Sequence, residues 1–238
     1  MFWRKADLLD PDRAAWVQDR MAWIVNRIGP REFTENLPLI LPTRDFFAAG
    51  SGTDHATAQA VLNDIARLMR MRDWPVTLLE MPDLGEDIWH GYQTLTQTAG
   101  TFELTEDGAI IRYMPSQLKT PIPFISTMAH EMAHFWLAPH RGDWPGGDAQ
   151  HELVTDLTSI THGFGIFQMM TADAWGWAGY LSQETRAYAL ALFLRATGQD
   201  PAEARAHLAG RPNKLLERAL RQLDRDPAPI ATLRSAGG

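Results

Sequence analysis

Residues 125–137 constrain the fold of this 238-residue chain most, because they carry no charged side chain outside one short motif. The motif reads H-E-x-x-H and consists of His130, Glu131 and His134, with the apolar residues Met132 and Ala133 between them. Placing such polar side chains in an otherwise apolar helix costs free energy unless a partner compensates them. The segment therefore predicts a helix whose polar motif needs a partner inside the protein.

The spacing of the two histidines suits a metal ion. Four helical residues turn about 400°, so His130 and His134 project from one face about 6 Å apart, where two imidazoles can bind one zinc ion. Glu131 lies about 100° around the helix, close enough to take a proton from a water held by the metal. The alternative is a pair of helix histidines that only hydrogen-bond in the core.

A catalytic zinc site needs a third protein ligand and one open position. Eighteen residues after His134, beyond a loop rich in Gly and Pro, Glu152 and Asp156 lie four residues apart on the next expected helix. One carboxylate can bind the metal, and the other can accept the Nδ1 proton of a ligating histidine. An exposed acidic face is the alternative, and it is disfavoured by the apolar neighbours Leu153, Val154, Leu157 and Ile160.

The two motifs resemble those of the gluzincin metallopeptidases, the thermolysin-like clan in which H-E-x-x-H is followed by E-x-x-x-D on the next helix. This resemblance covers residues 130–156. It implies a zinc peptidase with His130, His134 and Glu152 as ligands, Glu131 as general base and Asp156 supporting a ligand. A looser likeness, through residues 41–47, 155–158, 163–165 and 179–182, is to a group of uncharacterised bacterial zincin-like proteins.

Two other histidines compete for the place of third ligand. His151 adjoins Glu152, which is favoured because Asp156 follows it at the gluzincin spacing. In metzincins the third histidine lies six residues after the second, and His140 matches that position. The glycine that lets the metzincin motif turn is replaced here by Leu137.

The resemblance also implies a Tyr or His outside the ligand set that stabilises an oxyanion. His162 and Tyr180 are the candidates, with His140 and Arg141 as further possibilities. The expected hairpin at residues 101–114, directly before the metal helix, offers an edge strand along which a peptide substrate could lie. The alternative is a hairpin that only covers the core.

Local signals predict the remaining elements. Asp10 and Pro11 begin a helix that ends at Gly29, and Thr53 or Asp54 caps a second helix. Residues 37–41 form at most an edge strand, and residues 50–52 form a turn. A strand at 76–81 and a hairpin at 101–114 follow, with its turn at 105–108. Helices are expected up to residue 137 and at 150–168, 182–197, 201–209 and 212–224.

The expected fold is α+β: a zincin-like domain over residues 1–180, with a small mixed sheet, the H-E-x-x-H helix and a second ligand helix. A helical C-terminal segment, residues 181–238, packs onto it. Its many basic side chains alternate with acidic ones, which favours a solvated helix face over a nucleic-acid patch.

Composition excludes several classes of protein. The chain has no cysteine, which excludes disulfides and thiolate metal sites. A net charge of −7 without a basic run disfavours nucleic-acid binding. No segment is apolar for long enough to span a membrane. The N-terminus lacks the features of a secretory signal, so a cytoplasmic location is expected.

The sequence as a whole predicts a zinc-dependent hydrolase with one Zn²⁺ per chain that cleaves peptide or protein substrates. Three alternatives remain: a zincin-fold protein without activity that binds a partner, a hydrolase of non-peptide substrates, and a metzincin-like site using His140. The sequence carries no signal for an oligomeric state.

Overall fold

The computed structural model describes residues 6–48, 52–82, 100–174 and 180–235. The chain forms two compact units: a helical unit, Met1–Leu41 with Trp144–Gly238, and a sheet unit, Pro42–Asp143. The boundary expected near residue 180 lies inside the helical unit, and the turn expected at 50–52 lies mostly outside the described residues. The fold is mixed α and β, as the sequence predicts.

The sheet unit contains three strands: β1 (Val76–Glu80), β2 (Gly100–Thr105) and β3 (Gly108–Tyr113). Their order is β1-β3-β2, with β3 parallel to β1 and antiparallel to β2. The expected strand and hairpin are therefore confirmed, and Thr105 pairs with Gly108 at the turn. Strand β2 lies at one edge of this small mixed sheet.

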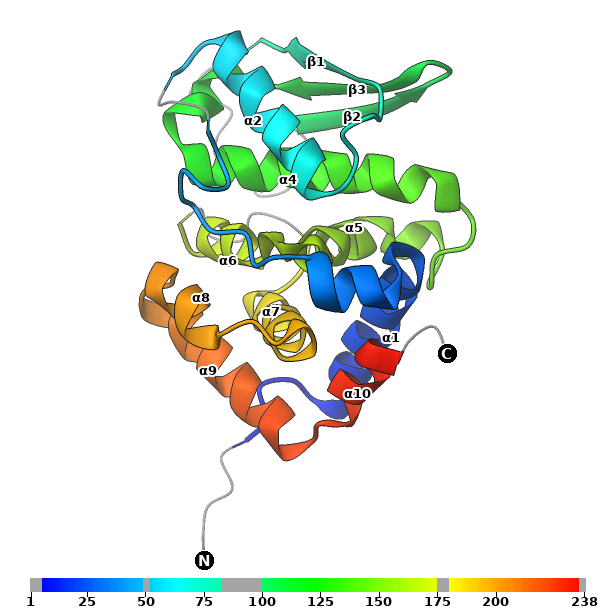
Figure 1. Cartoon of the computed structure of the whole chain (residues 1–238), viewed down its shortest axis with the longest axis vertical. Coiled ribbons are helices and arrows are strands. Elements are labelled where there is room, and N and C mark those ends of the chain that lie inside the picture. The colour runs from blue at the N-terminus through cyan, green and yellow to red at the C-terminus, as the bar shows by residue number, and fades with distance from the viewer. Residues whose placement is uncertain (1–5, 49–51, 83–99, 175–179, 236–238) are drawn as a thin grey trace, which may run out of the picture. The chain divides into compact units, whose positions relative to one another are not determined.

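Two helices accompany the sheet (Figure 1), α2 (His55–Leu68) and α4 (Pro121–Leu137). The Asp54 carboxylate accepts a hydrogen bond from the backbone N–H of Thr57 and caps α2. Helix α4 begins with a proline in its first turn and is buried along most of its length. It packs against β2 and α2, so the motif helix lies beside the sheet edge.

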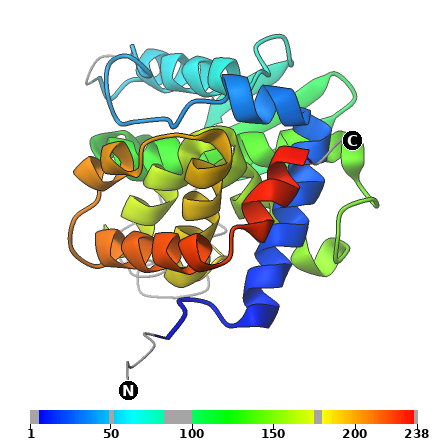
Figure 2. The same ribbon diagram turned by 60° about the horizontal axis from the view of Figure 1, so that its bottom comes forward.

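The helical unit is built around α7 (Gln183–Thr197), whose residues are buried on nearly every side. Helix α7 contacts α1 (Pro11–Ile28), α6 (Gly165–Ala174), α9 (Gly210–Arg225) and α10 (Ala228–Ser235). The short helix α8 (Pro201–His207) precedes α9. Figure 2 shows α10, which the sequence did not predict, lying against α1. Among the described helices, none has the length and hydropathy to cross a membrane.

The helix expected at 150–168 is interrupted. Helix α5 (His151–Ser159) is followed by a π-helical turn, Ile160–Phe164, before α6 begins. Gly163 has φ +96°, and a Cβ there would lie 2.3 Å from the carbonyl oxygen of Pro38. The N–H of Ile40 donates to the Gly163 carbonyl oxygen. Residues 37–41 therefore cross this kink and form no strand in the described structure.

Candidate metal centre

Helix α4 holds the two histidines in a geometry close to that of metal ligands. The Nε2 atoms of His130 and His134 are 3.1 Å apart, and their rings are nearly perpendicular, with centroids 4.7 Å apart. Two nitrogens bound to one tetrahedral zinc at about 2.0–2.1 Å are separated by about 3.3 Å. The i, i+4 spacing thus places the two imidazoles at hydrogen-bond distance in this structure, and their separation is close to the one that a shared ion requires.

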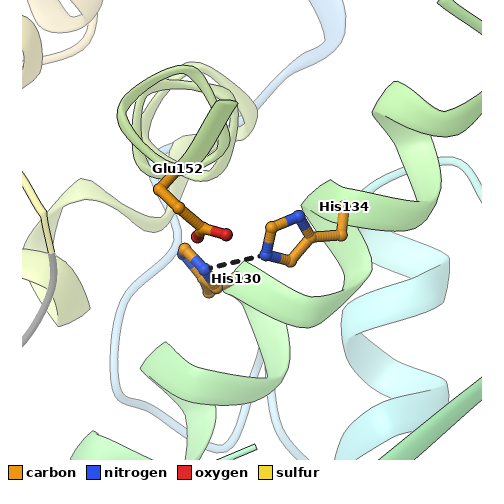
Figure 3. A group of neighbouring side chains, drawn as sticks. All are labelled: His130, His134 and Glu152. Carbon is orange, nitrogen blue, oxygen red and sulfur yellow. Dashed lines mark hydrogen bonds between the residues drawn. The ribbon is translucent and has the colours of Figure 1, made fainter. Parts of the chain in front are cut away.

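Glu152 completes a group that could hold a metal ion. It lies in the first turn of α5. One ligand atom from each of His130, His134 and Glu152 lies within 4.8 Å of the other two. Figure 3 shows the carboxylate of Glu152 directed toward the two imidazoles. The expected convergence of these three residues is therefore confirmed.

The buried carboxylate of Glu131 lies against the start of β2. Glu131 is 5% exposed. A Cβ placed on Gly100 would come within 2.9 Å of Glu131 Oε1 and 3.1 Å of its Cγ. Gly100 thus leaves the space that this carboxylate occupies. This role was not predicted from the sequence, although a glycine in a strand often marks a place where another group approaches closely.

Aromatic packing fixes the second motif histidine. The ring of Phe102, on β2, stacks on His134 with centroids 5.7 Å apart and planes 18° apart. On the same helix, Phe135 contacts Trp74 edge to face at 4.8 Å. The edge strand therefore places an aromatic ring against one of the two candidate ligands. Packing of this kind favours one orientation of the His134 ring.

The beginning of α5 is anchored to α1. Gln150 Oε1 accepts hydrogen bonds from Trp16 Nε1 at 2.8 Å and from an Arg20 guanidinium nitrogen at 3.0 Å. His151 stacks on Trp144, with ring centroids 4.5 Å apart. These contacts hold the turn that carries Glu152. No local pattern predicts these contacts, because Trp16 and Gln150 are 134 residues apart.

Asp156 lies in a buried ion pair. Its Oδ2 accepts hydrogen bonds from the backbone N–H groups of Tyr180 and Leu181, and from Arg186 on α7 at 3.2 Å. Asp156 and Arg186 are each 1% exposed. The expected support of a ligand histidine by Asp156 stays a prediction. Arg186 belongs to the basic C-terminal segment, and its burial against Asp156 was not predicted from the sequence.

The competing histidines are not members of the converging group. Among the described residues, the metal-ligand group consists of His130, His134 and Glu152. His140 ends a 3-10 turn after α4, and its ring lies 5.3 Å from that of Trp136. His151 instead stacks on Trp144. The group thus includes Glu152 and neither of these two histidines, and the assignment of a third ligand stays a prediction.

The two candidate oxyanion donors differ in environment. His162 is 2% exposed, and its Nδ1–H donates to the Thr158 carbonyl oxygen at 2.8 Å. Burial lowers the pKa of His162 to about 4, although the bond to Thr158 opposes this shift. A neutral imidazole protonated at Nδ1 has an Nε2 that accepts rather than donates. Tyr180 is 38% exposed. Both roles stay predictions, and the neutral tautomer of His162 suits a structural role better.

The buried His162 predicts a pH dependence of stability. Because its folded-state pKa of about 4 lies below the ordinary 6.5, the unfolded chain binds a proton more readily. Its contribution to stability is complete above pH 6.5 and is lost as the pH falls toward 4, by up to about 3 kcal/mol. Urea unfolding from pH 8 to 4.5 should show a shallower decline for His162→Gln than for the wild type. His207→Gln, at the end of α8, is the control and should keep the wild-type slope; equal slopes in all three proteins would contradict the assignment.

Comparisons of the chain with models of known protein families, with curated proteins and with solved structures give no match. The functional interpretation of His130, Glu131, His134 and Glu152 therefore rests on their own geometry and chemistry.

Proposed function

We propose that this protein is a zinc-dependent hydrolase that cleaves peptide bonds. The observation that carries the proposal is the convergence of His130, His134 and Glu152 within 4.8 Å. Two imidazoles and one carboxylate form a donor set that zinc accepts and that catalytic zinc sites use, with the fourth position open. Mg²⁺ and Ca²⁺ prefer all-oxygen sites, which makes them poorer fits to this group.

Glu131 is the proposed general base. When bound, zinc polarises a carbonyl oxygen and lowers the pKa of a water molecule. Glu131 takes a proton from the attacking water, and the water oxygen forms a bond to the carbonyl carbon. The carbon–nitrogen bond then breaks, and Glu131 passes the proton to the leaving amine. The absence of a side chain at Gly100 leaves the space in which this carboxylate lies.

The edge strand β2 favours an extended peptide as substrate. It pairs with β3 on one side, and none of the described strands pairs with its other side. Phe102 places the strand beside the ligand helix through its stacking on His134. A peptide can add to such an edge through main-chain hydrogen bonds. The exposed ion pair between Glu103 and Arg112, at 2.8 Å, discourages pairing with another sheet.

Metal removal tests the proposal. The full chain, purified without added metal, is expected to contain one zinc per molecule and to cleave members of a random peptide library. A chelator should abolish cleavage, and added zinc should restore it. Absence of zinc, without uptake on titration, would overturn the metal assignment. Zinc without peptide cleavage would instead indicate an inactive binding protein, or a hydrolase of other substrates if esters or non-peptide amides are cleaved.

A further inference from the structure

The exposed side of α9 carries a regular row of basic residues. They follow one another at alternating spacings of three and four residues, which places them along one side of the helix: Arg211, Lys214, Arg218, Arg221 and Arg225. The other side of α9 is buried and includes Leu216, Leu220 and Leu223. A basic row alone is typical of a solvated helix face, so a binding site requires a further observation.

That observation is a pocket at the C-terminal half of the row. It has a volume of about 360 Å³ and is lined by Ala6, Arg218, Arg221 and Arg225. Figure 1 shows the beginning of the described chain approaching this end of α9. Small-molecule sites commonly have volumes of about 300–1,000 Å³. Three guanidinium groups therefore share one concave surface of a size suited to a small ligand.

The charges of two of these arginines are only partly balanced. Arg225 forms an ion pair with the carboxylate of Asp7. Arg218 donates instead to the backbone carbonyl oxygen of Asp7, at 3.3 Å, and this acceptor carries no formal charge. One carboxylate thus faces two guanidinium groups at this side of the pocket.

The third arginine has a shared partner. Arg221 lies 3.7 Å from the carboxylate of Glu217, which also pairs with Arg205. Arg221 is 48% exposed in its side chain. Exposed ion pairs of this kind are weak, so an incoming anion can replace them at little cost. The pocket keeps an excess of positive charge in a chain whose net charge is −7.

We propose that this pocket binds a small ligand with two or more linked phosphate groups. The planar guanidinium group matches phosphate oxygens with two parallel hydrogen bonds. Arg218 and Arg225 are seven residues apart on α9, which corresponds to about 10 Å along the helix axis. Linked phosphates offer a separate pair of oxygens to each of the three guanidinium groups, whereas a single phosphate has four oxygens in all. The proposal uses none of the metal-centre residues and does not depend on the proposed hydrolase activity.

Binding of inorganic tripolyphosphate to the full chain tests this proposal. Isothermal titration at about 0.15 M salt should give saturable binding with one site per chain. Arg221→Gln should weaken binding roughly tenfold or more, because charge-assisted hydrogen bonds are lost. Arg31→Gln is the matched control, since it removes the same charge from another exposed ion pair, with Glu35. It should bind as the wild type does.

Three further measurements keep the outcome unambiguous. Arg218→Gln should weaken binding as Arg221→Gln does, and it serves as the second variant if the first fails to fold. Glu152→Ala should leave binding unchanged, which separates the pocket from chelation of a metal at the other centre. Absence of saturable binding, equal weakening by Arg31→Gln, or loss of binding in Glu152→Ala would each overturn the proposal. So would an RNA oligonucleotide that competes equally at the same phosphate concentration, since that result would indicate a nucleic-acid surface.

Discussion

Glu131→Gln is expected to lower kcat/KM for peptide hydrolysis about 10²–10⁴-fold, the range of general acid–base catalysis, while the protein retains its zinc. An amide has nearly the shape of a carboxylate, so the buried position against Gly100 should remain filled. It does not take up a proton at neutral pH, so both proton transfers lose their carrier. Steady-state kinetics on a peptide from the library, with zinc content measured on the same sample, provide the test.

Glu203→Gln supplies the control for this experiment. Glu203 is an exposed residue in the first turn of α8, so its substitution removes the same charge from the surface. Its activity should equal that of the wild type. A wild-type rate in Glu131→Gln would show that another group activates the water. Loss of zinc in that variant would show that Glu131 helps to hold the metal.

Elements with local signals were predictable from the sequence. Asp10 and Asp54 cap α1 and α2 through bonds to backbone groups three residues away. Pro121 lies in the first turn of α4, and the turn of the hairpin falls at residues 105–108 as expected. In each case the contact that determines the element joins residues a few positions apart, so the local sequence is enough to predict it.

Breaks imposed by distant parts of the chain were not predictable. The sequence predicts one continuous helix over residues 150–168, which includes Gly163. The interruption coincides with the carbonyl oxygen of Pro38, which leaves no space for a Cβ at Gly163. Helix α10 has only eight residues and a weak local signal, and it lies against α1 and α7.

In the candidate metal centre, too, local features were predictable and distant contacts were not. The spacing of His130 and His134 follows from one helix, so it could be derived from geometry alone. The choice among Glu152, His151 and His140 depends on how the next segments return, and the sequence left it open. The groups that support the centre, such as Gly100, contact it across large sequence separations. No periodicity in the sequence marks such contacts.

Glu152→Ala is expected to remove zinc from the protein. The substitution removes one of the three proposed ligands, and alanine offers no oxygen in its place. The loss of affinity should exceed the roughly 10–100-fold that follows from removal of a residue supporting a ligand. The loss of zinc affinity is measured in two ways: by the zinc content after gel filtration, and by competition with a coloured chelator. Hydrolysis should fall with the zinc content.

The zinc content of Asp156→Ala is harder to interpret than that of Glu152→Ala. The sequence predicts that this variant keeps the metal with about 10–100-fold weaker binding. Removal of the Asp156 side chain also leaves the guanidinium of Arg186 buried without the carboxylate that pairs with it. Breaking a buried pair in this way costs about 3–5 kcal/mol. A fall in zinc content would therefore combine a weaker site with a less stable protein, and urea unfolding should show the second effect.

The decisive comparisons are His151→Ala and His140→Ala. His151 is adjacent to Glu152 and stacks on Trp144, so its substitution disturbs the same turn without removing a ligand of the group. His140 lies beyond the end of α4 beside Trp136. Both variants should retain one zinc per chain. If Glu152→Ala keeps zinc and one of the histidine variants loses it, the third ligand is that histidine. Only the substitution of a group that binds the ion directly leaves the site one ligand short.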